Sequence, residues 1–564
     1  MKKLPCSIFN DVIGPVMRGP SSSHVAGGAR IAELVRQSFT APVKKVTVDF
    51  DPSGALAASH YGHGTDMGFA CGLMGMDLSD PGVDQYERLA RECGIEIQYR
   101  VMEYGAVHPG NYRIHAEAKD GAVHDWEAIS TGGGMIEMQK LDGFGVNICG
   151  DFYEILVVVD CEKEDLKTWI GKLSAMLPAA EFCLESPGTK IGTETGLINW
   201  KMARPVEQET VEAVKRTAGV MDVITLEPIL PTHSRADCDV PFSSAGELLE
   251  YAKEHPADTL VEHSADTLAE HPADTLAEHP VDASGYHPPI RRLDAWEYAV
   301  LYESIRGNMS SAEVLEKMDA IYTVMEQAVD QGLAGTSYKD RILGPQAHKV
   351  EEQERQGKLI PCNLMSAVIR NITAVMEVKS SMGLIVAAPI VGSCGCLPGT
   401  VIGLGRELGL SRKEIIQGLL TAGLIGVWIA EAATFSAEVA GCQVECGAAS
   451  GMTAAAVTQM MGGSVEQCID AASMAMQNIT GLACDPVANR VEVPCLGKNV
   501  MGGFNALASA DMALAGFDAV IPLDETITAI YKIGLSLPLE LRCTCGGLGK
   551  TKTSMEIMEE MKRK

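Results

Sequence analysis

The chain has 564 residues, of which 46% are hydrophobic and only 5% aromatic, and its formal net charge at pH 7 is −28. So negative a charge argues against nucleic acid as a partner and is typical of a soluble protein. The length predicts three or four domains, and the 57 glycines favour tightly packed helices over a β-sandwich.

The cysteines favour a reducing compartment. The chain holds 17 of them, an odd number that does not suit a fully paired disulfide framework. Residues 1–6 show no apolar core of signal-peptide length. We therefore expect a cytoplasmic protein, with no membrane partner, whose thiols are free to bind metal.

The N-terminal part of the chain predicts an α+β fold. In residues 1–150, residues 46–50 alternate as a strand does, and residues 11–36 form a loop that feeds a helix. Residues 151–235 alternate strands and helices, which is typical of a small ferredoxin-like module, and resemble ACT-type regulatory domains without their usual Asp-x-Pro-Gly turn. The expected strands of this module are 153–159, 196–202 and 220–226, and its expected helices are 164–176 and 206–218.

Residues 236–290 contain a repeat with a period of eight. The string Ala-Asp-Thr-Leu recurs at residues 257, 265 and 273. A His-rich tract is able to bind metal, but the prolines and the short period favour a duplicated acidic linker. The histidines that share the period are His255, His263, His271, His279 and His287.

Residues 291–564 predict an all-helical domain. Ser411 followed by Glu414 is a capping-box signature at the start of one helix. Residues 380–405 are uncharged and long enough to span a membrane, but Pro389 and Pro398 favour a buried loop and helix. The expected helices are 293–306, 311–331, 364–378, 411–433 and 464–478.

Two segments of the N-terminal portion are candidate anion sites. Hydroxyls and free backbone N–H groups just before a helix would hold a carboxylate, or would only cap that helix. A run of glycines is either a second anion-binding nest or a flexible turn. The first segment is Ser21, Ser22, Ser23 and His24, and the second is Thr131, Gly132, Gly133 and Gly134.

Two histidines lie near glycines and are candidate bases. His63 stands between Gly62 and Gly64, and His108 precedes Pro109 and Gly110. A histidine between glycines is not expected to be a packed core residue. Each is therefore either a general base or a loop residue of no consequence.

Cys442, Cys484 and Cys495 lie among glycine, alanine and proline rather than in a helical core pattern. Thiolates are the usual ligands of iron–sulfur clusters, and three ligands on a four-iron cluster leave one iron free to act as a Lewis acid. Spacing alone does not single out this triple. Two other pairs offer thiols, namely Cys394 with Cys396 and Cys543 with Cys545.

Taken together, these strings resemble the bacterial iron–sulfur-dependent L-serine dehydratases (L-serine ammonia-lyases), in the form that joins β and α portions. Residues 19–24, 62–66 and 131–134 are similar to the β portion. The likeness covers nearly everything except the repeat. The strings similar to the α portion are residues 381–389, 397–399, 437–439 with 442–443, 484–487 and 493–495.

The resemblance implies a [4Fe–4S] cluster held by Cys442, Cys484 and Cys495, without pyridoxal phosphate. The open iron would take the hydroxyl of L-serine, and a base, His63 or His108, would remove the α-proton to give pyruvate and ammonia. We also expect a homodimer with a role in amino-acid degradation and gluconeogenesis. The implied substrate-binding residues are Ser21, Ser22, Ser23, His24, Thr131, Gly132, Gly133, Lys498 and Asn499.

Two departures from the family pattern keep alternatives open. Lys379 stands where the family usually has Asn, and residues 390–391 replace Thr-Ala. A lysine near the pocket would favour a substrate with a second negative group, or would only point to solvent. The alternatives are β-elimination from threonine or cysteine on the same cluster, a non-catalytic amino-acid sensor, and a thiol-rich zinc or redox protein.

Overall fold

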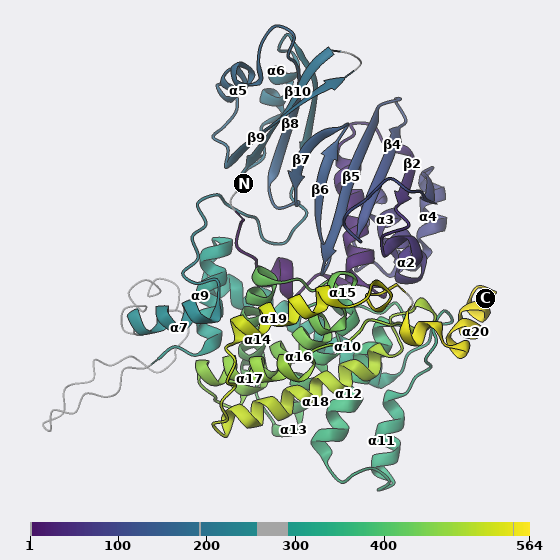
Figure 1. The fold of residues 1–564 in the computed structure, drawn as a ribbon, viewed down its shortest axis with the longest axis vertical. Helices are drawn as coiled ribbons and strands as arrows, with labels where there is room; N and C mark the ends of the chain where they lie inside the picture. Colours follow the sequence, from purple (N-terminus) through teal and green to yellow (C-terminus); the bar gives the residue numbers. More distant parts are fainter. Residues whose placement is uncertain (1–2, 191–192, 256–291, 545, 564) are drawn as a thin grey trace, which may run out of the picture.

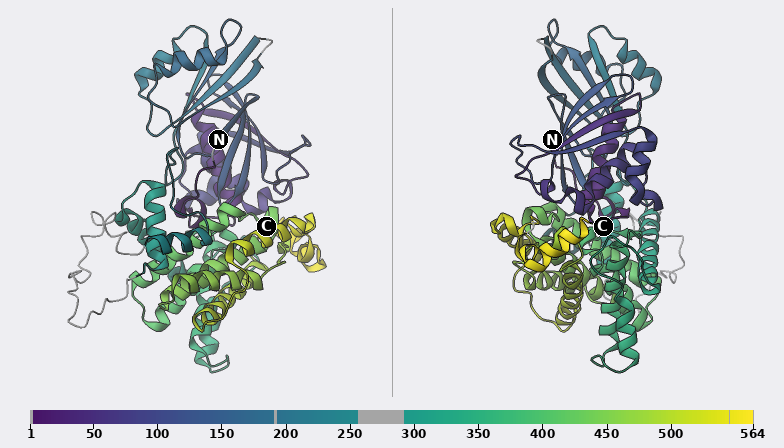
Figure 2. Two further views of the ribbon diagram at one scale, coloured as in Figure 1. Left: turned by 60° about the vertical axis from the view of Figure 1, so that its left-hand side comes forward. Right: turned by 90° about the vertical axis from the view of Figure 1, so that its right-hand side faces the viewer.

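The computed structural model describes residues 3–190, 193–255, 292–544 and 546–563. Figure 1 shows two β-sheets at one end of the molecule and a helical body at the other. Figure 2 shows the same division from two further directions. The expected order, an α+β N-terminal region followed by a helical region, is therefore correct. The repeat from residue 257 onward lies outside the described residues.

The N-terminal sheet has six strands in the order β3-β2-β4-β5-β6-β7, and β2 and β3 are its parallel pair. One face packs against helices, where Tyr112 on β4 stacks on Phe69 of α3 (Thr65–Met74). Helix α1 (Gly27–Gln37) contacts β5, β6 and α3. The strands are β2 (Val43–Phe50), β3 (Glu96–Val101), β4 (Asn111–Ala118), β5 (Val123–Gly132), β6 (Met135–Leu141) and β7 (Phe144–Ile148).

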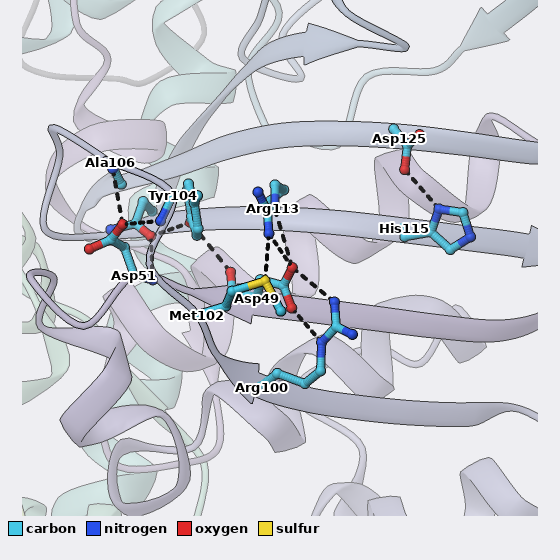
Figure 3. Close-up of polar contacts among 10 residues, drawn as sticks. Asp49, Asp51, Arg100, Met102, Tyr104, Ala106, Arg113, His115 and Asp125 are labelled. Carbon is cyan, nitrogen blue, oxygen red and sulfur yellow. Dashed lines mark hydrogen bonds and ion pairs between the residues drawn. The ribbon is translucent and has the colours of Figure 1, made fainter.

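The opposite face of this sheet is polar. Asp49 on β2 accepts hydrogen bonds from Arg100 on β3 at 2.7 Å and from Arg113 on β4 at 2.8 Å (Figure 3). His115 and Asp125 form an exposed pair further along (Figure 3). Exposed ion pairs contribute only about 0–1 kcal/mol each. The stability of this region therefore comes from the helical side of the sheet.

The second sheet belongs to residues 153–226 and has the antiparallel order β11-β8-β10-β9. With one helix after β8 and one after β10, this is the ferredoxin-like arrangement expected from the sequence. The edge strand β9 was not predicted. The elements are β8 (Tyr153–Asp160), α5 (Leu166–Ser174), β9 (Phe182–Lys190), β10 (Thr193–Met202), α6 (Gln208–Lys215) and β11 (Val220–Leu226).

The helical region contains all five helices expected from the sequence, and the Ser411–Glu414 capping box is present. The predicted helices are α9 (Ala295–Gly307), α10 (Ser311–Ala334), α12 (Asn363–Lys379), α14 (Arg412–Ala432) and α17 (Val465–Asn478). Helix α13 (Cys396–Leu408) begins in the segment expected to be a buried loop and helix. The helices that were not predicted include α11 (Ala347–Arg355), α16 (Cys446–Met460), α18 (Cys495–Leu514), α19 (Leu523–Ser536) and α20 (Lys552–Met561).

The first residues of the chain pack into the core of the helical region rather than with the sheet that follows them. Ile8 and Val12 lie against Gly423 and Gly426 of α14, where an added Cβ would meet their side chains at 2.6 and 2.0 Å. Strand β1 (Val16–Met17) pairs with β12 (Ile385–Val386) of the helical region. This segment joins the two regions and brings residues 19–24 to their boundary.

One described helix, α14, is long and apolar enough to cross a membrane, but 78% of its apolar window is buried inside the protein. Core helices of soluble proteins pass the same test. The uncharged stretch 380–405 is a buried loop that contains β12 and leads into α13, as its prolines predicted.

Candidate active site

His24 lies fully buried where the N-terminal segment turns into α1. Ser59 donates its hydroxyl proton to the carbonyl of Ala55 at 2.7 Å, so it accepts from His24 Nε2 at 2.7 Å. Nδ1 is then the acceptor and faces Ser21 Oγ at 3.0 Å. Burial, and after it the nearby His60, lower the pKa of His24 to about 3. His24 is therefore neutral at physiological pH.

His63 is the last residue of α2 (Leu56–His63) and is only 1% exposed. The expectation that a histidine between glycines is not packed was wrong, because Gly64 ends the helix in a left-handed conformation (φ 85°) and allows the ring to turn inward. The ring lies edge-on to His24 with centroids 4.6 Å apart. Burial lowers the pKa of His63 well below its usual value. Its buried Nε2 has no hydrogen-bond partner among the described residues.

Glu438 connects this histidine pair to the helical region. It lies on α15 (Ala437–Ala440) and accepts hydroxyl hydrogen bonds from Ser23 at 3.2 Å and Ser436 at 2.8 Å. His24 Nδ1 is 3.6 Å from the carboxylate, but a neutral imidazole makes no ion pair there. The charge of Glu438 opposes the effect of burial on the pKa of His63. Glu438 is thus placed to stabilise His63 once that ring gains a proton.

Residues of the two candidate anion sites contact the helical region across its boundary with the N-terminal region. Ser22 Oγ accepts a hydrogen bond from the backbone N–H of Val391 at 3.2 Å. Gly132 (φ 110°) lies so close to Ser436 that an added Cβ would meet its atoms at 3.0 Å. Gly132 and Gly133 are buried, so this turn is a packed support for the chain that enters α15.

Thr131 and His108 lie at the edge of the same boundary. The backbone carbonyl of Thr131 accepts a hydrogen bond from Thr434 at 3.3 Å. His108 is half-buried, and its Nδ1 accepts the backbone N–H of Gly110 at 3.0 Å. Burial lowers the pKa of His108, and Glu438 opposes this effect. Of the two candidate bases, His63 has the buried nitrogen without a partner.

The cysteines gather on the helical side of this boundary. The sulfurs of Cys442 and Cys484 and a carboxylate oxygen of Glu445 all lie within 4.8 Å of one another. Hydrogen bonds from Cys446 and Cys484 lower the pKa of Cys442 well below its usual value, which favours the thiolate. Cys484 is also hydrogen-bonded to Cys543. Burial, followed by the charge of Cys442, raises the pKa of Glu445 well above its usual value.

Cys495, the first residue of α18, is near this group but does not belong to the set of donors within 4.8 Å. A negative charge on Cys495 would nonetheless raise the pKa of Cys446. Asn499, one turn later, donates to the carbonyls of Gly392 and Cys495 at 2.8 Å and accepts from the N–H groups of Gly395 and Cys396 at 3.1 and 3.0 Å. Its amide oxygen and nitrogen are each engaged twice, so Asn499 ties Cys495 to the loop before α13, and its expected substrate-binding role stays a prediction.

Lys498 serves the cysteine group as well. Its Nζ donates to the carbonyl of Ala483 at 2.7 Å and to Asp485 at 3.0 Å, and it lies 3.7 Å from Cys442 Sγ. Burial lowers the pKa of this lysine, but the charges of Cys442 and Asp485 outweigh burial and raise it. These contacts place Lys498 beside the proposed thiolate, and the expected substrate-binding role of this lysine stays a prediction.

This donor set fits an iron–sulfur cluster. Cys442, Cys484 and Cys543 are buried thiols without disulfides, and Lys498 compensates negative charge beside them. Thiolates are the usual ligands of such clusters, and neighbouring cations favour the thiolate form.

A mutation at Gly392 tests how tightly the site is built. An added Cβ there would meet Glu445 Oε1 at 1.8 Å, which forces the carboxylate away from Cys442. We expect Gly392→Ala to lower the free energy of unfolding by about 1–3 kcal/mol and to reduce iron content. Gly497→Ala on α18 is the matched control, because an added Cβ there meets nothing within 4 Å. Alanine also favours the helix over glycine by about 1 kcal/mol. Chemical denaturation measures the free energy of unfolding, and iron analysis measures the iron content. Equal stability of the two variants would contradict the close packing of Gly392 against Glu445.

A pocket of 480 Å³ opens between the two regions. Gly62 and Gly64, which flank His63, line it from the N-terminal side. Lys379, Arg490 and Glu492 line it from the helical side. His63 itself does not line this pocket and is only 1% exposed, so the pocket reaches the two glycines that flank it rather than its ring.

The structure thus brings most predicted site residues to one boundary and adds three that the sequence did not single out. Glu438, Glu445 and Cys446 lie at its centre. Glu438 and Glu445 stand inside or next to the string that carries Cys442. The sequence does hold a signal for these two glutamates, because carboxylates are uncommon in an apolar stretch and both stand close to a predicted thiolate ligand.

Comparison with known proteins gives the family. The family model described as the serine dehydratase alpha chain matches residues 205–548, which is more than half of the chain. The family model described as the serine dehydratase beta chain matches residues 11–98. The probable L-serine dehydratase alpha chain of Bacillus subtilis is 42% identical over 44% of this chain and 83% of its own length. The L-serine dehydratase alpha chain of Peptoniphilus asaccharolyticus is 37% identical over 46% of this chain and 90% of its own length. The probable beta chain of Bacillus subtilis is 40% identical over 27% of this chain and 67% of its own length. The chain therefore belongs to the serine dehydratase family and carries the β-type and α-type regions in one polypeptide.

Proposed function

We propose that this protein converts L-serine to pyruvate and ammonia in the cytoplasm, with a [4Fe–4S] cluster as its cofactor. The observation that carries the proposal is the juxtaposition, across one boundary, of a buried cysteine group and a buried histidine with an unpartnered nitrogen. The family supplies the substrate, since its relatives are named for L-serine.

The cysteine group would hold the cluster. Its proposed ligands are Cys442 and Cys484, whose sulfurs lie within 4.8 Å of each other, and Cys495 at the start of α18. When bound, the cluster supplies a Lewis-acidic iron that assists departure of a hydroxyl group. Hydroxide is a poor leaving group, so a reaction of this kind needs such help. The proposal involves no pyridoxal phosphate.

The histidine side would move the proton. His63 is neutral, and its unpartnered Nε2 would accept the α-proton of serine while the C–O bond breaks and hydroxide leaves; the proton taken by His63 and this hydroxide together make up the water released. The resulting aminoacrylate tautomerises to an imine, which takes up one water to give pyruvate and ammonia. Glu438 offsets the positive charge that develops on His63.

The test is an assay of anaerobically purified protein against L-serine, L-threonine and L-cysteine, together with iron and labile sulfide analysis. We expect pyruvate from L-serine with the highest kcat/KM, and iron and sulfide in near-equal amounts. Turnover of threonine or cysteine in preference to serine would favour the alternative eliminase. Serine binding without product would favour a sensor, and zinc without sulfide would exclude the cluster.

A further inference from the structure

Lys379 is a buried cation without a counterion. It is the last residue of α12 and is only 1% exposed. Its Nζ donates to the backbone carbonyl of Val491. Among the residues that the structure describes, no carboxylate oxygen lies within 4.0 Å of this Nζ. A buried charge is costly unless it is paired, so the folded protein holds an ammonium group that lacks a negative partner.

The pocket is also lined by Arg88 and Arg91 of α4 (Tyr86–Cys93), both exposed to solvent, and by Arg490, which shares the helical side with Lys379 and is compensated. Arg490 forms a two-point hydrogen bond with Asp340, at 2.7 and 3.0 Å. Glu492, the nearby acid, is occupied by the backbone N–H groups of Ile342 and Leu343 at 3.0 Å. The uncompensated charge on this wall of the pocket therefore belongs to Lys379.

Lys379 also lies between the two halves of the site. Its charge acts on His63 on one side and on Cys495 on the other. It lines the 480 Å³ pocket together with Gly62 and Gly64. An ammonium group has three donors, and the carbonyl of Val491 takes one of them. Two donors remain for a ligand that enters the pocket beside His63.

We propose that Lys379 binds the carboxylate of the amino-acid substrate and so presents its α-carbon to His63. The proposal rests on the proposed function for the identity of the substrate, and on the unpaired buried charge for the identity of the group. A carboxylate is the part of a small amino acid that matches this charge, and a charge-assisted hydrogen bond is the strong kind. Ser21, Ser23 and His24 have hydrogen-bond partners within the protein, which leaves the anchoring of the carboxylate to Lys379.

The experiment compares binding of L-alanine and L-alaninamide by isothermal titration calorimetry to anaerobically prepared full-length protein. L-Alanine lacks the hydroxyl and does not react, and the amide differs from it by the carboxylate charge. We expect wild-type protein to bind L-alanine at least about tenfold more tightly. Lys379→Gln, which keeps a donor for Val491 but no charge, should lose that preference, and Lys379→Arg should keep it. Lys413→Gln, at an exposed position of α14, is the matched control.

Several outcomes would overturn the proposal. A wild-type protein without preference for the acid over the amide contradicts it, and this measurement needs no variant. Full preference in Lys379→Gln contradicts it as well. Loss of iron and sulfide from Lys379→Gln with the preference intact would assign the lysine to the cofactor instead. Pyruvate formation from L-serine is measured separately: a protein that binds L-alanine through Lys379 but makes no pyruvate keeps this inference and rejects the proposed function.

Discussion

Replacement of Cys484 by serine will abolish turnover and strip the protein of iron and labile sulfide while the helices stay folded. Cys484 is 6% exposed and its sulfur is hydrogen-bonded to both Cys442 and Cys543, so its loss opens the centre of the donor group. Loss of partners that only support a metal ligand costs about 10- to 100-fold in activity, so loss of a ligand is expected to cost at least about 100-fold. The measurements are iron and sulfide per chain, visible absorbance, circular dichroism and pyruvate formation.

Two further variants make this result specific. Cys93→Ser replaces an exposed cysteine of α4 (Tyr86–Cys93) and is expected to keep cluster and activity. Cys484→Ser/Cys543→Ser removes the neighbouring thiol that is placed to substitute for the missing ligand. Full iron content and full activity in the double variant would refute the assignment of Cys484 to the cofactor.

The elements with strong periodic or alternating patterns were predictable from the sequence. Helix α14 shows its capping box at Ser411 and Glu414 and a repeated apolar face, and the strands β8, β10 and β11 and both helices of residues 153–226 are equally plain, whereas the edge strand β9 is not. Helix α16 has no such pattern. All its residues are buried on every side, from Cys446 to Met460, so no polar face marks its period.

The candidate site was predictable only in its parts. Motif strings indicated Ser21 to His24, His63 and the cysteines, but their meeting depends on contacts between segments hundreds of residues apart. Ser23 is hydrogen-bonded to Glu438, and β1 pairs with β12. Neither contact has a local signature. The burial of His63 also follows from these contacts, because the helical region covers a residue that looks exposed in its own Gly-His-Gly string.

Replacement of His63 by glutamine is expected to lower kcat for L-serine by about 10²- to 10⁴-fold, the usual contribution of a general base, without loss of iron or sulfide. The physical reason is that His63 Nε2 is buried and has no hydrogen-bond partner among the described residues. His115→Gln is the matched control, since His115 lies on the exposed polar face of the sheet (Figure 3). Steady-state kinetics and metal analysis of both variants provide the measurement. Unchanged kcat in His63→Gln would transfer the role to another group, with His108 next.

The pH profile gives an independent check of the same residue. Because burial holds the pKa of His63 well below its ordinary value of 6.5, its ring stays unprotonated as the pH falls through that value. A base with an ordinary pKa would instead lose activity tenfold for each pH unit below about 6.5. We therefore expect kcat/KM for wild-type protein to remain flat across this range and to fall only at more acidic pH. A break near 6.5 would mean that the base is a group with an ordinary histidine pKa, and that the buried, unpartnered nitrogen of His63 does not take the α-proton.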